Sequence, residues 1–391
     1  MTNRELFLQH VAQTSPFPIG LEIAKASGIH MWDINGKSYI DLISGFSVCN
    51  IGHSNAAVIQ AVKDQVDKYM HLIVYGEFIE APQVAYAKLL TDHLPPTLNS
   101  VYFTNSGAEA TEGAMKLCKR VTGRTKIIAC NKAYHGSTQG ALSIMGDEYW
   151  RNAFRPLLPD VYHFDYNSDE LLNSIDRQTA CVVIETVQAE SGINKPDNNW
   201  LIALRKKCDD NCVLLVFDEI QAGFGRTGSL WAFEQYNIVP DILLLGKALG
   251  GGMPLGAFIA DVRLMNTLTS NPVLGHITTF GGHPVSCAAG MAAMNELLHN
   301  KWIEEVFSKE KLLNQVLIHP KIKAVKSAGL WMALEFDSFE TCKSVIDRCI
   351  EKGIITDWFL FAPNCLRIAP PLIITFEEIE MVCRVILESM E

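Results

Sequence analysis

Short apolar runs alternate with helix-compatible stretches through the middle of the chain. The runs are aliphatic, and they lie at 100–107, 125–131, 180–186, 211–221 and 241–247. The last three recur at intervals of about thirty residues, with sequence between them that suits a helix. Continuous apolar strands that alternate with helices indicate βαβ units and a parallel sheet covered on both faces. We therefore predict an α/β architecture for this region.

A charged residue follows the apolar part of each of the last three runs. These residues are Glu185, Asp218 and Lys247. In parallel sheets, ligands bind beyond the carboxyl ends of the strands, so the three side chains mark a candidate site. Charged residues also appear wherever a strand simply leaves the core for solvent, and the pattern alone does not separate these interpretations.

The two ends of the chain have a different pattern. Residues 26–45 resemble a β-hairpin with its turn at Asn35-Gly36. From about residue 295, amphipathic helices alternate with short strands, which is typical of a smaller α+β domain. We predict an N-terminal segment at 1–48 that joins the small domain, a large domain at 49–294 and a C-terminal small domain at 295–391.

The amino-acid composition limits the binding partners and the cellular compartment that we expect for this protein. The 391 residues are 48% hydrophobic and carry a formal net charge of -10, which argues against a nucleic-acid or anionic-membrane surface. The N-terminus lacks the apolar core of a signal peptide, and no run nears the roughly 18 to 20 residues of a membrane span. The 11 cysteines are scattered and odd in number, which favours reduced thiols in a cytoplasmic protein.

The stretch at 101–120 reads as a strand, a tight turn and a helix. Ser106 with Glu109 fits a capping box, which is a purely structural interpretation. The alternative is an anion site, in which Asn105, Ser106 and Gly107 turn tightly and the first helical N–H groups face a phosphate. Both interpretations stay open at this point.

Two further motifs favour no ligand. The sequence GFGRTG at 223–228 satisfies the GxGxxG expression, but four residues separate it from the strand and a poor helix follows. We interpret it as a flexible loop. His276 and His283 fit no metal-ligand spacing and are interpreted as structural histidines.

Lys247 raises a separate question, because it follows a buried run and precedes several glycines. A lysine held against apolar strands is partly desolvated, which lowers its pKa and frees the amine as a nucleophile. Asp218 would be placed to face a cationic ring nitrogen. A lysine amine, an aspartate and a phosphate cradle are what a protein needs to hold pyridoxal phosphate. The alternative is a Lys247–Asp218 salt bridge that closes the edge of the sheet.

Seven motifs occur in one order along the chain: NSGAEATEGAMKLCKR, YHGST, VIETVQAESG, VFDEIQAGFGRTG, LLLGKALGGGMPLGAF, TTFGGHP and LRIAPPL. In this the sequence resembles the class-III aminotransferases, which are pyridoxal-phosphate enzymes of fold type I. Its length is most similar to the acetylornithine and ornithine branch. The resemblance implies a mostly parallel seven-stranded sheet flanked by helices, a smaller α+β domain from both termini, and a homodimer with shared active sites.

The resemblance also implies roles at the cofactor. Lys247 would bind it covalently, Asp218 would pair with its ring nitrogen, and these two residues would be catalytic. Gln221 would bond its phenolic oxygen, and Tyr134 would stack on its ring. Thr279 would reach the phosphate from the partner subunit. The residues expected at the cofactor are Ser106, Gly107, Ala108, Tyr134, His135, Glu185, Asp218, Gln221, Lys247 and Thr279.

Four residues are expected at the substrate: Glu190, Arg367, Thr278 and Ser137. In the ornithine branch, an arginine takes a substrate carboxylate when a glutamate releases it, and Arg367 and Glu190 hold those positions. Ser137 marks a departure, because related enzymes carry an arginine there that grips a second carboxylate. Arg151 or Arg155 would have to replace that cation.

The expected activity is a ping-pong transfer of an amino group from an amino acid or ω-amino donor to a 2-oxo acid, as in amino-acid metabolism. Two alternatives remain at this point. One is another pyridoxal-phosphate reaction on the same scaffold, either an aminomutase or a decarboxylating transaminase. The other is a pyridoxal-phosphate-binding protein without turnover.

Overall fold

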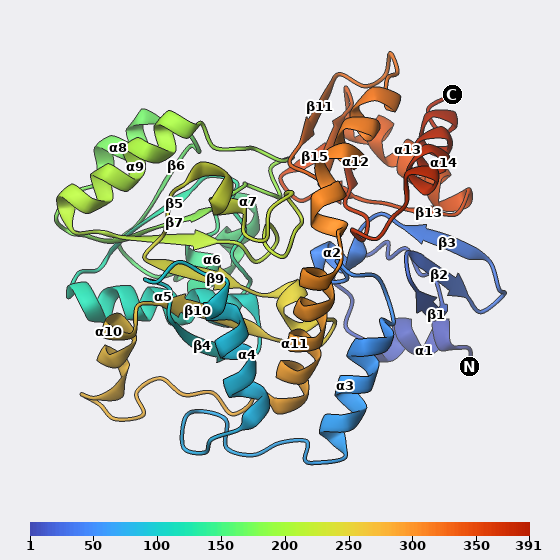
Figure 1. Cartoon of the computed structure of the whole chain (residues 1–391). Coiled ribbons are helices and arrows are strands. Elements are labelled where there is room, and N and C mark those ends of the chain that lie inside the picture. The colour runs from blue at the N-terminus through green and yellow to red at the C-terminus, as the bar shows by residue number, and fades with distance from the viewer.

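The computed structural model describes residues 1–391 and contains three β-sheets (Figure 1). The seven-stranded sheet has the order β4-β10-β9-β8-β7-β5-β6, with β4 (Ser100–Thr104), β5 (Lys126–Cys130), β6 (Val161–Phe164), β7 (Thr179–Glu185), β8 (Leu214–Asp218), β9 (Ile242–Leu245) and β10 (Gly256–Ala260). An N-terminal sheet has the order β1-β2-β3-β13, with β1 (Ile23–Ser27), β2 (His30–Asp33), β3 (Ser38–Asp41) and β13 (Ile354–Ile355). A C-terminal sheet has the order β11-β12-β15-β14, with β11 (Ala324–Ser327), β12 (Met332–Glu335), β14 (Trp358–Phe359) and β15 (Ala362–Ile368).

The helices connect and cover these sheets. They are α1 (Asn3–His10), α2 (Ser44–Ser47), α3 (Ala56–Val66), α4 (Ala81–Asp92), α5 (Gly107–Thr122), α6 (Gln139–Ser143), α7 (Glu148–Arg151), α8 (Asp169–Ser174), α9 (Asn198–Asn211), α10 (Val262–Met265), α11 (Pro284–His299), α12 (Trp302–Val316), α13 (Phe339–Glu351) and α14 (Phe376–Glu388). Four 3₁₀ turns complete the set: η1 (Asn152–Phe154), η2 (Ala232–Tyr236), η3 (Lys247–Gly250) and η4 (Asn266–Thr269). None of these helices is long and apolar enough to cross a membrane.

The seven-stranded sheet confirms the predicted α/β class. Strand β10 runs antiparallel to both β4 and β9, and every other pairing in the sheet is parallel. All seven residues of β7 are buried, because α8 and α9 cover one face of the sheet and α5 covers the other (Figure 1). Strands β6 and β10 were not predicted, since neither contains a continuous aliphatic run like those of β7, β8 and β9.

The register of this sheet brings the predicted charged residues to one edge. Glu185 pairs directly with Asp218 at the carboxyl ends of β7 and β8. Asp218 in turn pairs with Leu244 on β9, and Lys247 follows shortly after that strand. The three residues thus leave the sheet at the same edge, as the apolar runs indicated.

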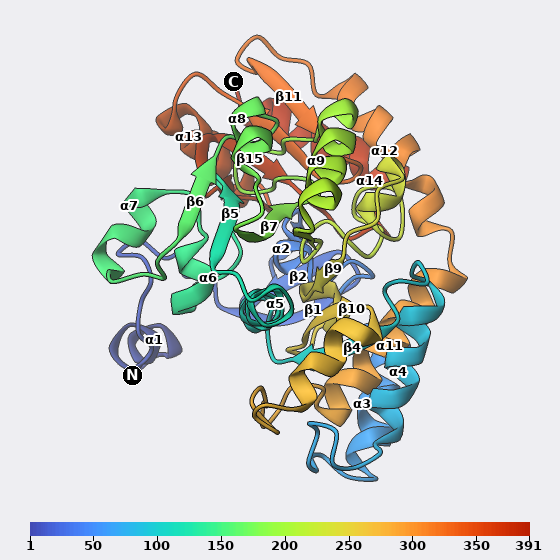
Figure 2. The ribbon, with the colours of Figure 1, turned by 90° about the vertical axis from the view of Figure 1, so that its left-hand side faces the viewer.

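The N-terminal hairpin also has the predicted form. Strands β2 and β3 are antiparallel, and Gly36 in their connection has a φ of 81°, which glycine adopts without strain. Strand β3 pairs in parallel with β13, so the two ends of the chain share a sheet. The proposed boundary at residue 294 falls within α11, and the division into domains stays a prediction. Helix α1 buries no residue and protrudes from the rest of the chain (Figure 2).

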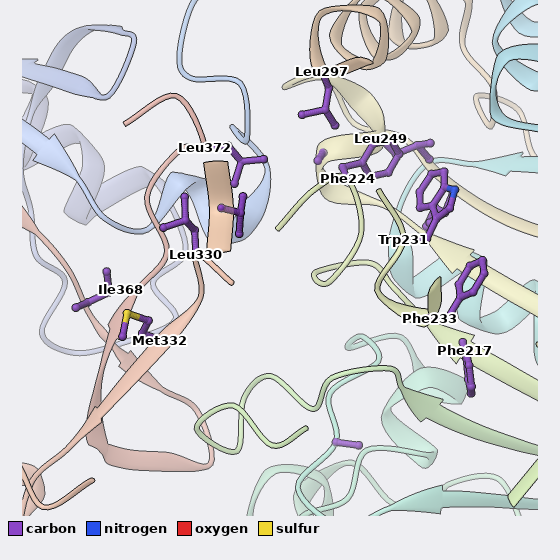
Figure 3. Close-up of a cluster of buried hydrophobic side chains, with 14 of the residues drawn as sticks. Phe217, Phe224, Trp231, Phe233, Leu249, Leu297, Leu330, Met332, Ile368 and Leu372 are labelled. Atoms are coloured by element: carbon purple, nitrogen blue, oxygen red, sulfur yellow. The ribbon is translucent and has the colours of Figure 1, made fainter. Parts of the chain in front are cut away.

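One buried core joins the sheets. A cluster of 60 buried residues includes side chains from the large sheet, the N-terminal sheet and the C-terminal sheet. Figure 3 shows part of it, with Phe217, Phe224, Trp231 and Phe233 on one side and Leu330, Met332, Ile368 and Leu372 on the other. The sheet edge with Asp218 and the strand with Arg367 are therefore held in a fixed relation by apolar packing.

The GFGRTG segment is a loop, as predicted, but it is buried. Residues 221–227 are buried, and Arg226 at its centre is 0% exposed. Its guanidinium donates hydrogen bonds of 2.6 to 3.0 Å to Ser44 Oγ, Asn50 Oδ1, the Leu330 carbonyl and the Pro370 carbonyl. The expected flexibility does not agree with these bonds, because the arginine fixes the loop to three other segments.

Replacement of this arginine is expected to destabilise the fold. In Arg226→Met, four buried oxygens lose a charged donor, so we expect the free energy of unfolding to fall by about 3 kcal/mol or more. Urea denaturation followed by circular dichroism measures this change. Arg263→Met is the matched control, since Arg263 is exposed. An equal midpoint for the two variants would contradict the structural role of Arg226.

Candidate active site

A cavity of about 270 Å³ lies at the carboxyl edge of the large sheet. It is lined by Ser106, Gly107, Ala108, Tyr134, His135, Gly136, Ser137, Glu185, Asp218, Ile220, Gln221, Ala222 and Lys247. The structure thus brings together every predicted cofactor residue except Thr279, together with Ser137. A larger cavity of about 600 Å³, beside Tyr166 and Lys195, contains none of the predicted residues.

Lys247 enters this cavity from the first position of η3. Its φ of 49° lies in the left-handed region, which is uncommon for a side chain with a Cβ and is typical of functional positions. Lys247 is a half-buried residue, and its amine forms no hydrogen bond or ion pair within the chain. Burial lowers the pKa of Lys247, which favours the neutral, nucleophilic amine. The alternative of a Lys247–Asp218 salt bridge is therefore not what the structure contains.

Asp218 is occupied by other partners. Its Oδ2 lies 2.7 Å from Nδ1 of the buried His135, and its Oδ1 accepts a hydrogen bond of 2.9 Å from the Ile220 N–H. Glu185 lies beside it in the sheet, and burial followed by the charge of Asp218 raises the pKa of Glu185 well above its usual range. This favours a protonated Glu185 next to the Asp218 carboxyl group. The sequence pointed to each residue but not to the contact between Asp218 and His135.

Helix α5 presents its N-terminus to the cavity. Ser106 caps the helix, and its Oγ accepts a 3.2 Å hydrogen bond from the Glu109 N–H. The Glu109 carboxylate bonds the N–H of Asn105 rather than that of Ser106, so the predicted capping box is only half formed. The N–H groups of Gly107 and Ala108 donate to no atom of the chain. Free N–H groups at the positive end of a 16-residue helix are suited to an anion.

Two of the glycines that line the cavity have no room for a side chain. A Cβ at Gly107 would lie 2.7 Å from Ile220 Cδ1, and a Cβ at Gly136 would lie 2.5 Å from Ala108 Cβ. Gly136 also has a φ of 128°. The backbone of both glycines therefore approaches its neighbours closely, which leaves the space of the cavity free.

Glu190 and Arg367 form a buried ion pair next to this cavity. Arg367 Nη1 and Nη2 lie 3.0 and 2.8 Å from the two carboxylate oxygens of Glu190. Gln221, which lines the cavity, donates a 3.2 Å hydrogen bond to the same carboxylate. Burial alone would raise the pKa of Glu190, but the Arg367 charge holds it at about 2. The pair is thus fully ionised at neutral pH and adjoins the Lys247 cavity through Gln221.

Other predicted residues lie outside the cavity. Thr278 accepts a 3.0 Å hydrogen bond from Asn105 and contacts the turn before α5, whereas Thr279 is exposed. Arg151 and Arg155 both pair with Glu148, and neither lines the cavity. The side chain that faces the cavity at position 137 is a serine, whose Oγ lies 3.2 Å from the Tyr134 hydroxyl. No arginine therefore lines this cavity.

The model of the family "Aminotransferase class-III" matches residues 11–390. The chain belongs to the class-III aminotransferases. It is 37% identical to the acetylornithine aminotransferase of Methanopyrus kandleri, over 97% of this chain and 96% of that protein. It is 34% identical to ornithine aminotransferase 1 of Staphylococcus aureus, over 93% of each chain.

A solved structure supports the same relationship. The ornithine aminotransferase of Toxoplasma gondii superposes with a TM-score of 0.92 at 30% identity, over 99% of this chain and 92% of that one. The description of that structure records pyridoxal phosphate at its active site. Our chain is accordingly an aminotransferase of fold type I that depends on pyridoxal phosphate.

The cavity of this class-III aminotransferase fits that cofactor. Three buried polar atoms around it have no hydrogen-bond partner: His135 Nε2, Glu185 Oε2 and Gln221 Oε1. Such atoms are unfavourable unless a bound group or water satisfies them. Together with the unpaired amine of Lys247 and the free N–H groups of α5, they offer an amine, polar contacts and an anion cradle in one small volume. Pyridoxal phosphate requires these features.

Sequence reasoning missed several residues around Arg367. Asp357 Oδ1 lies 3.0 Å from Arg367 Nε, and the rings of Phe46 and Phe359 lie 5.0 and 4.3 Å from the guanidinium carbon. A hairpin signal at 358–368 would have placed Asp357 beside Arg367, because Trp358 pairs with Leu366 across the hairpin. Phe46 carried no such signal, since it reaches Arg367 only through the tertiary fold.

Proposed function

We propose that this aminotransferase moves the amino group of an acetylornithine-like or ornithine-like donor to a 2-oxo acid, by a ping-pong mechanism. The observation that carries the proposal is the buried Glu190–Arg367 pair beside the Lys247 cavity. It offers a bidentate carboxylate site that its own glutamate can occupy when the substrate brings no carboxylate. Curated relatives named as acetylornithine and ornithine aminotransferases support the donor class.

In this proposal Lys247 and Asp218 are the catalytic residues. Pyridoxal phosphate, when bound, supplies an electrophilic carbon and a conjugated ring that accepts the electron pair of a broken C–H bond. Asp218 would pair with the ring nitrogen of the cofactor, and its 2.7 Å contact with His135 fixes the carboxyl group in place. The amine of Lys247, whose pKa is lowered by burial, is suited to act first as a nucleophile and then to move a proton.

The remaining cavity residues hold the cofactor in this proposal. The N–H groups of Gly107 and Ala108 bind the phosphate, since they have no acceptor in the chain. Tyr134, which lines the cavity, would stack on the ring. Gln221 bonds the phenolic oxygen and also donates to Glu190, so it couples the cofactor position to the carboxylate site.

Arg367 distinguishes the two substrates. A substrate carboxylate that enters this site replaces Glu190 at Nη1 and Nη2 of Arg367. When a donor brings only its amine to the site, the ion pair between Glu190 and Arg367 stays intact. An unpaired buried arginine is costly, so the glutamate and the substrate exchange places rather than leave the charge empty. With a serine at position 137, the second carboxylate of 2-oxoglutarate has no arginine to meet in this cavity. This favours a monocarboxylate acceptor such as pyruvate over 2-oxoglutarate.

We also propose a cytoplasmic homodimer in which Thr279 completes the partner's site. Thr279 is exposed and lies in a loop with large exposed apolar side chains, namely Val273, Leu274, Ile277 and Phe280. The loop before α4 lies against it and exposes Met70, Phe78 and Ile79. Exposed apolar residues that gather in this way mark a protein interface. The cytoplasmic assignment rests on the 11 cysteines, all of which are free thiols.

Arg367→Ala tests the carboxylate site. We expect kcat/KM for a carboxylate-bearing acceptor such as pyruvate to fall by about a hundredfold, because a bidentate buried pair is lost. The change for the diamine putrescine, a donor without a carboxylate, is expected to be about tenfold or less. Steady-state kinetics on the holoenzyme measures both values, with Arg263→Ala as the exposed control. Equal losses for the two substrates would remove the role assigned to Arg367.

Mixed dimers test the shared site. In the proposed dimer, each site takes Lys247 from one subunit and Thr279 from the other. A mixed dimer of Lys247→Ala and Thr279→Ala subunits, formed by refolding an equimolar mixture, therefore contains one intact site. We expect a recovery of about a quarter of the wild-type activity from the statistics of random pairing. The comparison is each variant refolded alone. No gain on mixing, from a preparation in which mixed dimers are detected, would show that Thr279 does not act across subunits.

A further inference from the structure

Arg367 is bound by two carboxylates rather than one. Glu190 occupies the edge formed by Nη1 and Nη2, at 3.0 and 2.8 Å. Asp357 Oδ1 lies 3.0 Å from Nε, at the opposite edge of the guanidinium. Between these edges the planar group is flanked by the rings of Phe46 and Phe359. A buried cation of charge +1 therefore faces two acidic side chains and lies against two aromatic rings, and its Nη2 also donates to the Trp358 carbonyl at 3.2 Å.

The two carboxylates are not equivalent. The charge of Arg367 holds the pKa of Glu190 at about 2, whereas burial raises the pKa of Asp357 to about 6. The Leu360 N–H and Gln221 also donate to Glu190, while Asp357 Oδ1 accepts no hydrogen bond from the chain. Asp357 is thus an acidic group that the fold keeps beside Arg367 with no other side-chain partner.

The structural contact of this residue is made by its backbone. The Arg367 N–H donates a 2.8 Å hydrogen bond to the Asp357 carbonyl, which is part of the β14–β15 hairpin. The Asp357 side chain is 16% exposed. It forms an ion pair with the Arg367 guanidinium, and this contact does not have the geometry of a hydrogen bond. An amide in place of the carboxylate would therefore keep the hairpin and remove only the charge.

The position of Asp357 decides what an incoming carboxylate meets. In the proposed function a substrate carboxylate would displace Glu190 from Nη1 and Nη2, whereas Asp357 lies at Nε and would stay in place. We infer that Asp357 is a specificity-determining residue that weakens the hold of Arg367 on substrate carboxylates. The same site can then release a carboxylate product and accept an amine that carries none. This inference rests on the role proposed above for Arg367 as the substrate-carboxylate site.

Asp357→Asn tests the inference in the holoenzyme. We expect the KM for pyruvate to fall roughly fivefold, because one of two opposing charges near the guanidinium is gone. For putrescine we expect the Michaelis constant, or the inhibition constant if the diamine is not turned over, to change by less than about twofold. Asp357→Ser, which also removes the charge, must shift the ratio of the two constants in the same direction. Asp337→Asn serves as the control, since Asp337 is exposed and forms no ion pair.

The outcomes distinguish the inference about Asp357 from the proposed role of Arg367 as the carboxylate site. An unchanged or increased KM for pyruvate in both Asp357 variants overturns the inference. The inference is also overturned if Asp357→Asn still lowers the KM for pyruvate in the Arg367→Ala background. The effect of Asp357 must act through the arginine, so it should vanish when the arginine is absent. If Arg367→Ala by itself lowers kcat/KM equally for pyruvate and for the diamine, the proposed carboxylate site fails. If that variant is selective and Asp357→Asn changes nothing, only the inference about Asp357 fails.

Discussion

The 2.7 Å contact between Asp218 and His135 is the interaction on which the active site depends. Asp218 is the last residue of β8 and lies at the same edge of the sheet as Lys247. A carboxylate without other partners would form an ion pair with the lysine there, and its amine would then not be a nucleophile. Because His135 and the Ile220 N–H occupy both oxygens of Asp218, the lysine remains unpaired in a partly desolvated cavity. The sheet thus brings an amine and a carboxyl group to one edge, and the contacts that Asp218 makes elsewhere leave the amine without a partner.

Two buried arginines then connect this edge to the rest of the chain. Arg226 ties the loop after β8 to the N-terminal segment and to Pro370, which follows β15, the strand that carries Arg367. Arg367 in turn reaches Glu190, which follows β7. A substrate site is therefore assembled from segments far apart in the sequence, and the apolar core in Figure 3 keeps their spacing constant. This rigidity lets a single guanidinium exchange one carboxylate for another without an empty buried charge.

The sequence predicted the part of the site that local patterns control. Three apolar runs end in Glu185, Asp218 and Lys247, and parallel strands necessarily share an edge, so this cluster followed from pattern alone. Glu190 and Arg367 are 177 residues apart, and only resemblance to a family suggested them. The antiparallel strand β10, the buried state of Arg226 and the approach of Asp357 to Arg367 were missed. Each depends on tertiary packing or on an irregular hairpin register, neither of which leaves a periodic signal.

The central claim is that Lys247, left free by the Asp218–His135 contact, is the residue that carries pyridoxal phosphate. Borohydride reduction of the holoenzyme fixes the cofactor to its amine, and mass spectrometry of the proteolytic peptides then locates the added group. We predict that the modification falls on Lys247 and on no other lysine. A modification found on a different lysine, or a cofactor released intact from fully loaded and reduced protein, would contradict this claim.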